Sequence, residues 1–130
     1  MAKVLVAEDD DYLRRALVRV LDLREAMIGI GASSLIEASD LLGAQQFDAV
    51  IADLNLGDGS GLDLLREGRG FVLMTGETLD SSDLTRLAAL GVRVLLKPFS
   101  AKEYLEVIGA AVKDGRRPVN PSSTSVQDGR

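Results

Sequence analysis

The chain has 130 residues, 46% of them hydrophobic, which is the usual size of one domain with one continuous core. Its formal net charge of −5 argues against a surface that follows nucleic-acid phosphates or anionic lipid, because both need clustered Lys and Arg. The absence of cysteine and histidine excludes disulfides, thiolate chemistry and the commonest general base. No apolar run approaches the roughly 20 residues of a membrane span, so we expect a cytoplasmic protein that uses carboxylate, hydroxyl and amine chemistry.

Five short apolar runs rich in β-branched residues recur along the chain without polar alternation, which is typical of strands buried on both faces of a parallel sheet. These runs are Val4–Ala7, Met27–Ile30, Ala49–Ala52, Phe71–Thr75 and Val92–Leu96. A segment with the apolar spacing of a helix follows each run. The third segment, around residues 62–65, is brief, and we expect a helix of about two turns there. The pattern predicts five βα units.

Local signals mark the ends of several predicted helices. Ser34 and Ser100 are each followed three residues later by glutamate, which indicates a capping box at a helix start. Gly43 and Gly91 are expected to end two helices. From residue 114 the chain has almost nothing to bury, so it cannot offset its own ordering entropy. We therefore expect one domain over residues 1–113 and a disordered tail or linker over residues 114–130.

Acidic residues follow two of the predicted strands. The first strand ends in Glu8, Asp9 and Asp10, and the third ends in Asp53. Ligands of an open parallel α/β sheet bind beyond the carboxyl ends of its strands, where the strand order reverses. If the first and third strands are neighbours, their carboxylates converge and repel one another. A divalent cation removes this conflict, and an oxygen-only ligand set favours Mg²⁺, with Mn²⁺ as an alternative.

The fourth and fifth predicted strands end in Thr75 and Lys97. A carboxylate beside Mg²⁺ can attack phosphorus while the metal and a nearby ammonium offset the charge on the transferring oxygens. Asp53, Mg²⁺ and Lys97 suit these roles. Thr75 suits a hydrogen bond to a phosphoryl oxygen after transfer. The sequence therefore predicts a site that accepts a phosphoryl group.

Four short motifs stand in order within residues 3–112, each at the end of a predicted strand. They are V-L-V-A-E-D-D at the first strand, I-A-D-L at the third, M-T-G-E at the fourth and L-K-P-F at the fifth. Together they resemble the receiver domains of response regulators. The resemblance implies a flavodoxin-like α/β fold: a five-stranded parallel sheet of order 2-1-3-4-5, doubly wound with five helices, of which the third is shortened.

The resemblance also implies a role for each acidic residue. Asp53 matches the phosphoacceptor, and Asp9 matches the acid that binds Mg²⁺ directly. Glu8 matches an acid that acts on the metal mainly through water, and Asn55 a residue that lends its backbone carbonyl. Asp10 stands beside this set, and we expect it to cap the first helix.

Beyond the metal, the resemblance covers the strand ends at Thr75 and Lys97. Thr75 matches the switch hydroxyl, and Lys97 the lysine that pairs with the phosphoryl group and is followed by a cis peptide, here to Pro98. Three residues before the lysine, family members usually carry Tyr or Phe, whereas this chain has Val94. The side chain that couples phosphorylation to the output face in the family is therefore missing.

The implied function is a phosphoacceptor module that takes a phosphoryl group from a partner's phosphohistidine and signals through protein contacts. Its partners would be a histidine kinase or histidine phosphotransfer protein and a downstream protein target. It would be no enzyme, although it would catalyse its own phosphorylation and slow dephosphorylation. Two alternatives remain. A phosphatase of the haloacid dehalogenase type shares the Asp nucleophile but needs a second Asp where Asn55 stands, and a pseudo-receiver would bind partners without phosphorylation, which Val94 favours and the intact acidic site does not.

Overall fold

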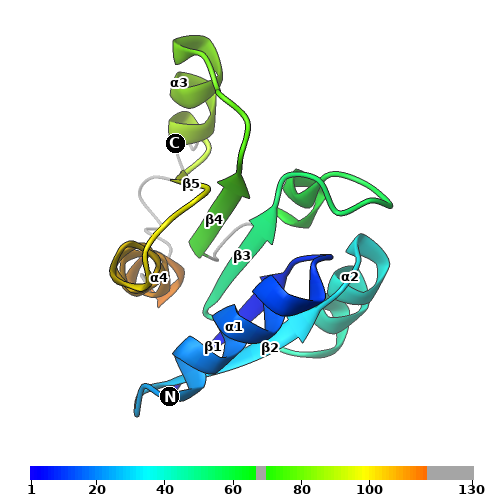
Figure 1. The fold of residues 1–130 in the computed structure, drawn as a ribbon, viewed down its shortest axis with the longest axis vertical. Helices are drawn as coiled ribbons and strands as arrows, with labels where there is room; N and C mark the ends of the chain where they lie inside the picture. Colours follow the sequence, from blue (N-terminus) through cyan, green and yellow to red (C-terminus); the bar gives the residue numbers. More distant parts are fainter. Residues whose placement is uncertain (67–69, 117–130) are drawn as a thin grey trace, which may run out of the picture.

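The computed structural model describes residues 1–66 and 70–116, which form a five-stranded parallel sheet with helices on both faces (Figure 1). The strand order is β2-β1-β3-β4-β5, which confirms the predicted order. The strands are β1 (Ala2–Ala7), β2 (Met27–Ala32), β3 (Ala49–Asp53), β4 (Gly70–Thr75) and β5 (Val92–Leu96). Each predicted run lies inside its strand, and the strand order reverses between β1 and β3.

The helices of the described residues differ from the prediction in one place. They are α1 (Asp11–Asp22), α2 (Leu35–Ala44), the 3-10 helix η1 (Gly61–Leu64), α3 (Ser81–Ala89) and α4 (Ala101–Arg116). The predicted third α-helix is therefore wrong in type, because η1 is a single turn closed by i→i+3 hydrogen bonds, such as Leu65 N to Leu62 O at 3.1 Å. A segment this short cannot recover the cost of nucleating an α-helix.

Two hydrophobic cores lie on opposite faces of the sheet, because successive residues of each strand point to opposite sides. One core packs α1 and α4 against the sheet and is built around Val4, Val6, Leu17, Leu21, Ile51, Val72, Met74, Tyr104 and Ile108. The other packs α2, η1 and α3 against the sheet and is built around Leu5, Ala7, Ala38, Leu42, Val50, Ala52, Leu64, Leu73 and Leu87. None of the helices in the described ranges is long and apolar enough to cross a membrane.

Side-chain caps begin α1 and α4 as the sequence predicts. The Asp10 carboxylate accepts from the backbone N–H of Leu13 at 3.1 Å. At α4 the capping box is complete: Ser100 Oγ accepts from Glu103 N at 3.0 Å, and Glu103 Oε1 accepts from Ser100 N at 2.9 Å. Each bond satisfies a backbone donor that the helix itself leaves unpaired.

The predicted capping box of α2 is only half formed. Ser34 Oγ accepts from Glu37 N at 3.1 Å, as expected, but the Glu37 carboxylate accepts from Ser33 N at 2.6 Å instead of from Ser34 N. Gly91 follows α3 with a φ of +77°, so the prediction that it ends a helix is confirmed. The corresponding prediction for Gly43 is wrong, because Gly43 lies inside α2 and the chain leaves that helix in an extended conformation.

The C-terminal end of α4 is fastened to the edge of the sheet where the strands begin. Arg116 Nε donates to Asp48 Oδ1 at 3.1 Å, and Asp48 Oδ2 accepts from Lys3 N at 2.8 Å. Arg93 pairs with Asp114 at 2.8 Å. The predicted domain boundary after residue 113 thus falls within α4, and residues 117–130 of the predicted tail lie outside the described residues.

Candidate functional site

The carboxyl ends of β1 and β3 bring the predicted acidic residues together. Ala7 of β1 pairs in register with Ala52 of β3, so the residues that follow them leave the sheet side by side. One carboxylate oxygen from each of Glu8, Asp9 and Asp53 lies within 4.8 Å of the other two. Glu8 is buried, Asp53 is half-buried and Asp9 is exposed, so the cluster opens to solvent on the side of Asp9.

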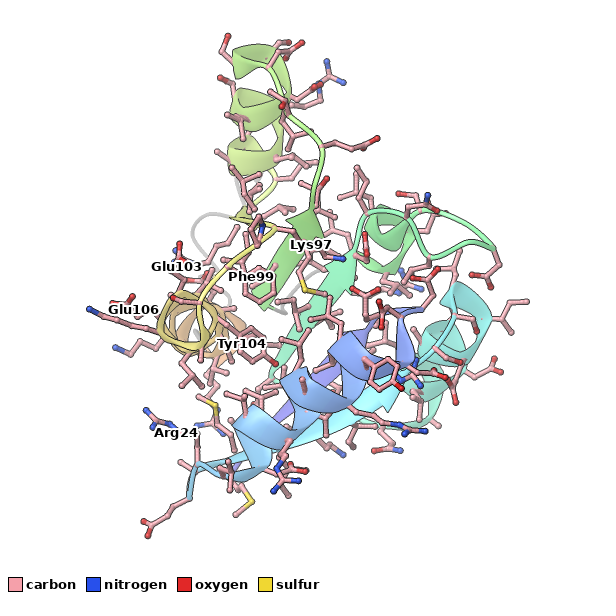
Figure 2. All side chains as sticks on the ribbon, viewed as in Figure 1. Arg24, Lys97, Phe99, Glu103, Tyr104 and Glu106 are labelled. Carbon is pink, nitrogen blue, oxygen red and sulfur yellow. The ribbon has the colours of Figure 1, made fainter. Side chains whose placement is uncertain are left out.

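Lys97 reaches this cluster from the end of β5, where its side chain is labelled in Figure 2. Its Nζ donates to Asp53 Oδ2 at 2.6 Å and to Glu8 Oε1 at 2.9 Å. The peptide bond between Lys97 and Pro98 is cis, as the resemblance predicts. The structure therefore joins residues from both ends of the domain in one ion-paired group.

The surroundings of this ion-paired group raise the pKa values of Glu8 and Lys97. Burial raises the pKa of the Glu8 carboxyl above its ordinary value, although hydrogen bonds from Lys97 and from Asp10 N oppose the effect. Burial works against the charged form of Lys97, but its hydrogen bonds to Asp53 and Glu8 prevail and raise its pKa. The ammonium therefore stays charged at neutral pH and compensates part of the negative charge.

The donor set suits a divalent cation with oxygen ligands. The three carboxyl groups outnumber the single Lys97 ammonium, and a divalent cation would balance the excess of acidic groups. Asp9, Asp53 and the Asn55 carbonyl are the oxygen ligands expected to hold Mg²⁺, with Glu8 behind them. The three carboxylates of Glu8, Asp9 and Asp53 fit such an ion in chemistry and spacing.

The loop after β3 holds the backbone of Asn55 beside Asp53. Asn55 N donates to Asp53 Oδ1 at 3.1 Å. Asn55 also forms a bridge to Ser60, but the two hydrogen bonds of that bridge are made by its neighbours, Leu54 and Leu56. The two hydrogen bonds of the bridge therefore do not involve the Asn55 carbonyl.

Thr75 lies at the neighbouring strand end and is buried. Its Oγ1 accepts from Glu77 N at 3.0 Å, and its backbone oxygen accepts from Lys97 N at 2.8 Å. In this structure the hydroxyl is thus engaged with the loop that follows β4. Val94 packs into the core on the side of α3, at the position where family members usually have an aromatic ring.

Two residues at this edge were not predicted from the sequence. Arg14 Nη1 donates to the backbone oxygen of Glu8 at 2.9 Å and so braces the turn between β1 and α1. Asp58 accepts from two backbone N–H groups at the start of α2. An Asp in a glycine-rich loop is a common sequence signal for a cap, but that signal does not identify a helix that precedes it in the chain.

Comparisons with known proteins agree with this geometry. A family model described as the response regulator receiver domain matches residues 4–109. The regulatory protein VirG of Agrobacterium fabrum is 29% identical over 133 residues, which cover 98% of this chain and 50% of VirG. The transcriptional regulatory protein KdpE of Mycobacterium tuberculosis is 35% identical over 121 residues, or 87% of this chain and 52% of KdpE. The chain spans about half the length of these relatives.

Solved structures show the same fold. The non-phosphorylated HemR receiver domain from Leptospira biflexa is similar with a TM-score of 0.78 and 28% identity, covering 92% of this chain and 100% of that one. A response regulator receiver protein from Pseudomonas putida has a TM-score of 0.71 and 31% identity, covering 84% and 96%. The chain therefore belongs to the response regulator receiver domains of two-component signalling systems.

Proposed function

We propose that this receiver domain accepts a phosphoryl group on Asp53, with Mg²⁺ held by Asp9, Asp53 and the Asn55 carbonyl, and by Glu8 mainly through water. The observation that carries the proposal is the convergence of three carboxylates and Lys97 at the strand ends where the sheet order reverses. A nucleophilic carboxylate, a cation site and a fixed ammonium are the components that phosphoryl transfer requires.

The contacts of Asp53 orient it for attack. Its Oδ1 accepts from Asn55 N and its Oδ2 from the Lys97 ammonium, so both carboxylate oxygens are held in place before a donor arrives. A carboxylate oxygen of Asp53 forms the bond to phosphorus while the bond between phosphorus and the donor nitrogen breaks. After transfer, the Lys97 ammonium can pair with the oxygens of the phosphoryl group instead of with the Asp53 carboxylate. Bound Mg²⁺ would neutralise further charge on these oxygens.

Thr75 is positioned to respond to the new group. Rotation about one side-chain bond would release its hydroxyl from Glu77 N and let it donate to a phosphoryl oxygen. Because Val94 has no ring to reorient, we propose that the change in the loop around Glu77 carries the signal.

A phosphohistidine donor must lie outside this chain, because the chain contains no histidine. We propose a histidine kinase or histidine phosphotransfer protein in the cytoplasm, where ATP is available to charge it. An apolar hollow next to Lys97, lined by Leu13, Pro98 and Phe99, supports docking of such a partner.

Exposed leucines on or beside α3 and β5 support output through protein contact: they are Leu84, Leu90 and Leu96. The acceptor is a side chain of the protein itself, so the domain is a signalling module instead of a conventional enzyme.

Intact mass spectrometry tests the proposal. After incubation with acetyl phosphate and Mg²⁺, the wild type should gain one phosphoryl group, whereas Asp53→Asn should gain none because an amide cannot act as the nucleophile. The same incubation with EDTA should give no adduct. Asp53→Asn also serves as the control for phosphorylation elsewhere. If the wild type gains no mass and does not bind beryllofluoride as a stable phosphoryl mimic, the domain is a pseudo-receiver.

A further inference from the structure

Asp58 joins the loop after Asp53 to α2. Its Oδ1 accepts from Leu35 N at 2.8 Å and its Oδ2 accepts from Ile36 N at 3.1 Å, across 23 and 22 residues of sequence. These are the first two N–H groups of α2, which the helix cannot pair internally. The two hydrogen bonds lower the pKa of the Asp58 carboxyl, so it is ionised at neutral pH. The Asp58 carboxylate thus links the exposed loop after β3 to the N-terminus of α2.

A series of hydrogen bonds at alternate residues connects this carboxylate with the phosphoacceptor. Asp53 Oδ1 accepts from Asn55 N at 3.1 Å, and Asn55 Oδ1 accepts from Gly57 N at 3.0 Å. Gly57 has a φ of +83°, a conformation that glycine adopts without strain, and Asp58 follows it directly. Hydrogen bonds therefore fix the loop between Asp53 and Gly57 at every second residue, and Asp58 joins its far end to α2.

Two glycines bring the loop close to the rest of the molecule. A Cβ at Gly59 would lie 2.4 Å from Cδ2 of Leu35, the first residue of α2. A Cβ at Gly61 would lie 2.0 Å from the backbone oxygen of Asp53. The loop is thus pressed against β3 at one end and against α2 near Asp58.

We propose that Asp58 is a positioning residue for the metal site: by anchoring the loop to α2, it holds the Asn55 carbonyl beside Asp53. The inference rests on the proposed Mg²⁺ site and adds the residue that organises it. Without the anchor the loop must lose more conformational freedom when a cation binds, and this cost weakens binding. Binding and anchoring are coupled in both directions, so a bound cation also stabilises the first turn of α2.

The simpler role for Asp58 is that of a helix cap with no bearing on the metal. Ser34 provides the matched control, because its Oγ caps the same end of α2 by accepting from Glu37 N and it does not contact the loop through that bond. Ser34→Ala removes one cap of α2 and leaves Asp58 in place. The two variants therefore separate the stability of the helix from the organisation of the loop.

Titration with Mn²⁺, followed by the electron paramagnetic resonance signal of the free ion, measures the affinity of the site directly. We expect Asp58→Ala to raise the Kd for Mn²⁺ about tenfold, the low end of the loss typical for residues that orient ligands. Asp58→Asn, which keeps one acceptor and the shape of the side chain, should raise the Kd less. Ser34→Ala should leave the Kd unchanged while lowering the melting temperature. In the wild type, Mg²⁺ should slow exchange of the Ala38 amide, which closes the first turn of α2, and this effect should be lost in Asp58→Ala.

Equal Kd values for wild type, Asp58→Ala and Asp58→Asn would overturn the inference. A Kd that rises equally in Ser34→Ala and Asp58→Ala would also overturn it, because both would then act through helix stability. A wild-type protein that binds no Mn²⁺ would overturn the metal site itself, a failure distinguishable because it appears without any substitution. Circular dichroism of each variant verifies that the fold is intact.

Discussion

Lys97 is the side chain on which the charge balance of the acidic cluster depends. It contacts both Glu8, which is 1% exposed, and Asp53, which is 14% exposed. Removing one partner of a buried ion pair is costly because it leaves the other charge uncompensated, but the 26% exposure of Lys97 itself reduces the effect. The metal-free domain therefore depends on this lysine for part of its stability.

We expect Lys97→Ala to lower the free energy of unfolding by about 1–2 kcal/mol in EDTA, because Glu8 and Asp53 then face each other without a counter-charge. Saturating Mg²⁺ should restore most of the loss by supplying the missing positive charge. Urea denaturation with EDTA and with MgCl₂ measures both values. An equal loss in the two conditions would mean that the lysine stabilises the domain by packing alone.

The residues of the cluster were predictable because they all follow strands of a parallel sheet. Such a sheet gathers its strand ends at one edge, so Glu8, Asp9 and Asp53 had to lie close together once β1 and β3 were neighbours. Lys97 starts two strands away from Asp53 and reaches the cluster through its long side chain. Their roles in binding and transfer stay predictions. Asp58 was not predictable, because the helix start that it caps lies 23 and 22 residues earlier in the chain, and no local spacing links the two.

At the scale of elements, two glycines of α4 have opposite surroundings. A Cβ at Gly115 would lie 1.8 Å from the backbone oxygen of Asp48, whereas a Cβ at Gly109 would meet no atom within 4 Å. Gly115 is thus needed for the close approach of α4 to the start of β3. Gly109 only lowers the helix propensity of its segment.

The same substitution should therefore have opposite effects within one helix. We expect Gly109→Ala to raise the free energy of unfolding by up to about 1 kcal/mol through helix propensity. Gly115→Ala should lower it by about 1–3 kcal/mol because the helix must move away from the sheet. Urea denaturation of both variants measures the changes. Stabilisation by Gly115→Ala would show that the end of α4 is not held against Asp48.

The type of an element, helix or strand, was predictable where the segment was long enough to show a regular spacing of apolar residues. The strands and the four α-helices follow their apolar spacing, and Asp10 and Ser100 cap as expected. The third helix failed because its segment is too short to recover the cost of nucleating an α-helix, so it forms only the 3-10 turn Gly61–Leu64.

At the scale of the whole molecule, Asp48 connects the two ends of the described chain. Its carboxylate accepts from Lys3 N on β1 and from the guanidinium of Arg116 on α4. The hydrogen bond from Arg116, with the bond from Lys3 N, holds the pKa of Asp48 below its ordinary value. A carboxyl with a lowered folded-state pKa adds stability that is present above its unfolded pKa and is lost as the pH falls through the folded value.

We therefore expect Asp48→Asn to lower the free energy of unfolding by about 0.5–1 kcal/mol at pH 7, because the charge-assisted contacts become neutral ones. The difference from wild type should stay constant between pH 6 and 8 and begin to shrink below about pH 4, where the carboxyl of the unfolded chain takes up a proton, and it should be lost once the pH falls below the lowered folded-state pKa. Urea denaturation across this pH range measures it. A difference that does not shrink at all as the pH falls from about 6 to 3 would assign the effect to side-chain shape instead of charge.

The strand order of the whole sheet came from the resemblance and not from the apolar pattern. Five buried strands alternating with helices fit several doubly wound orders, and hydrophobic spacing does not distinguish them. The motifs at the strand ends resemble those of the receiver domains, and that resemblance implied the order, in which β1 pairs with β3 as the structure shows. The topology was therefore predictable from family resemblance and not from periodicity.

The attachment of Arg116 to Asp48, and of Asp48 to Lys3, also bears on how the domain can be handled in experiments. Both ends of the described chain leave from the edge of the sheet where the strands begin, and the acidic cluster lies at the opposite edge. A fluorescent protein, an affinity tag or a surface linker fused before Met1 or directly after Arg116 would start on the side away from Asp53. Immobilised domains should therefore present the cluster to a phosphodonor in solution.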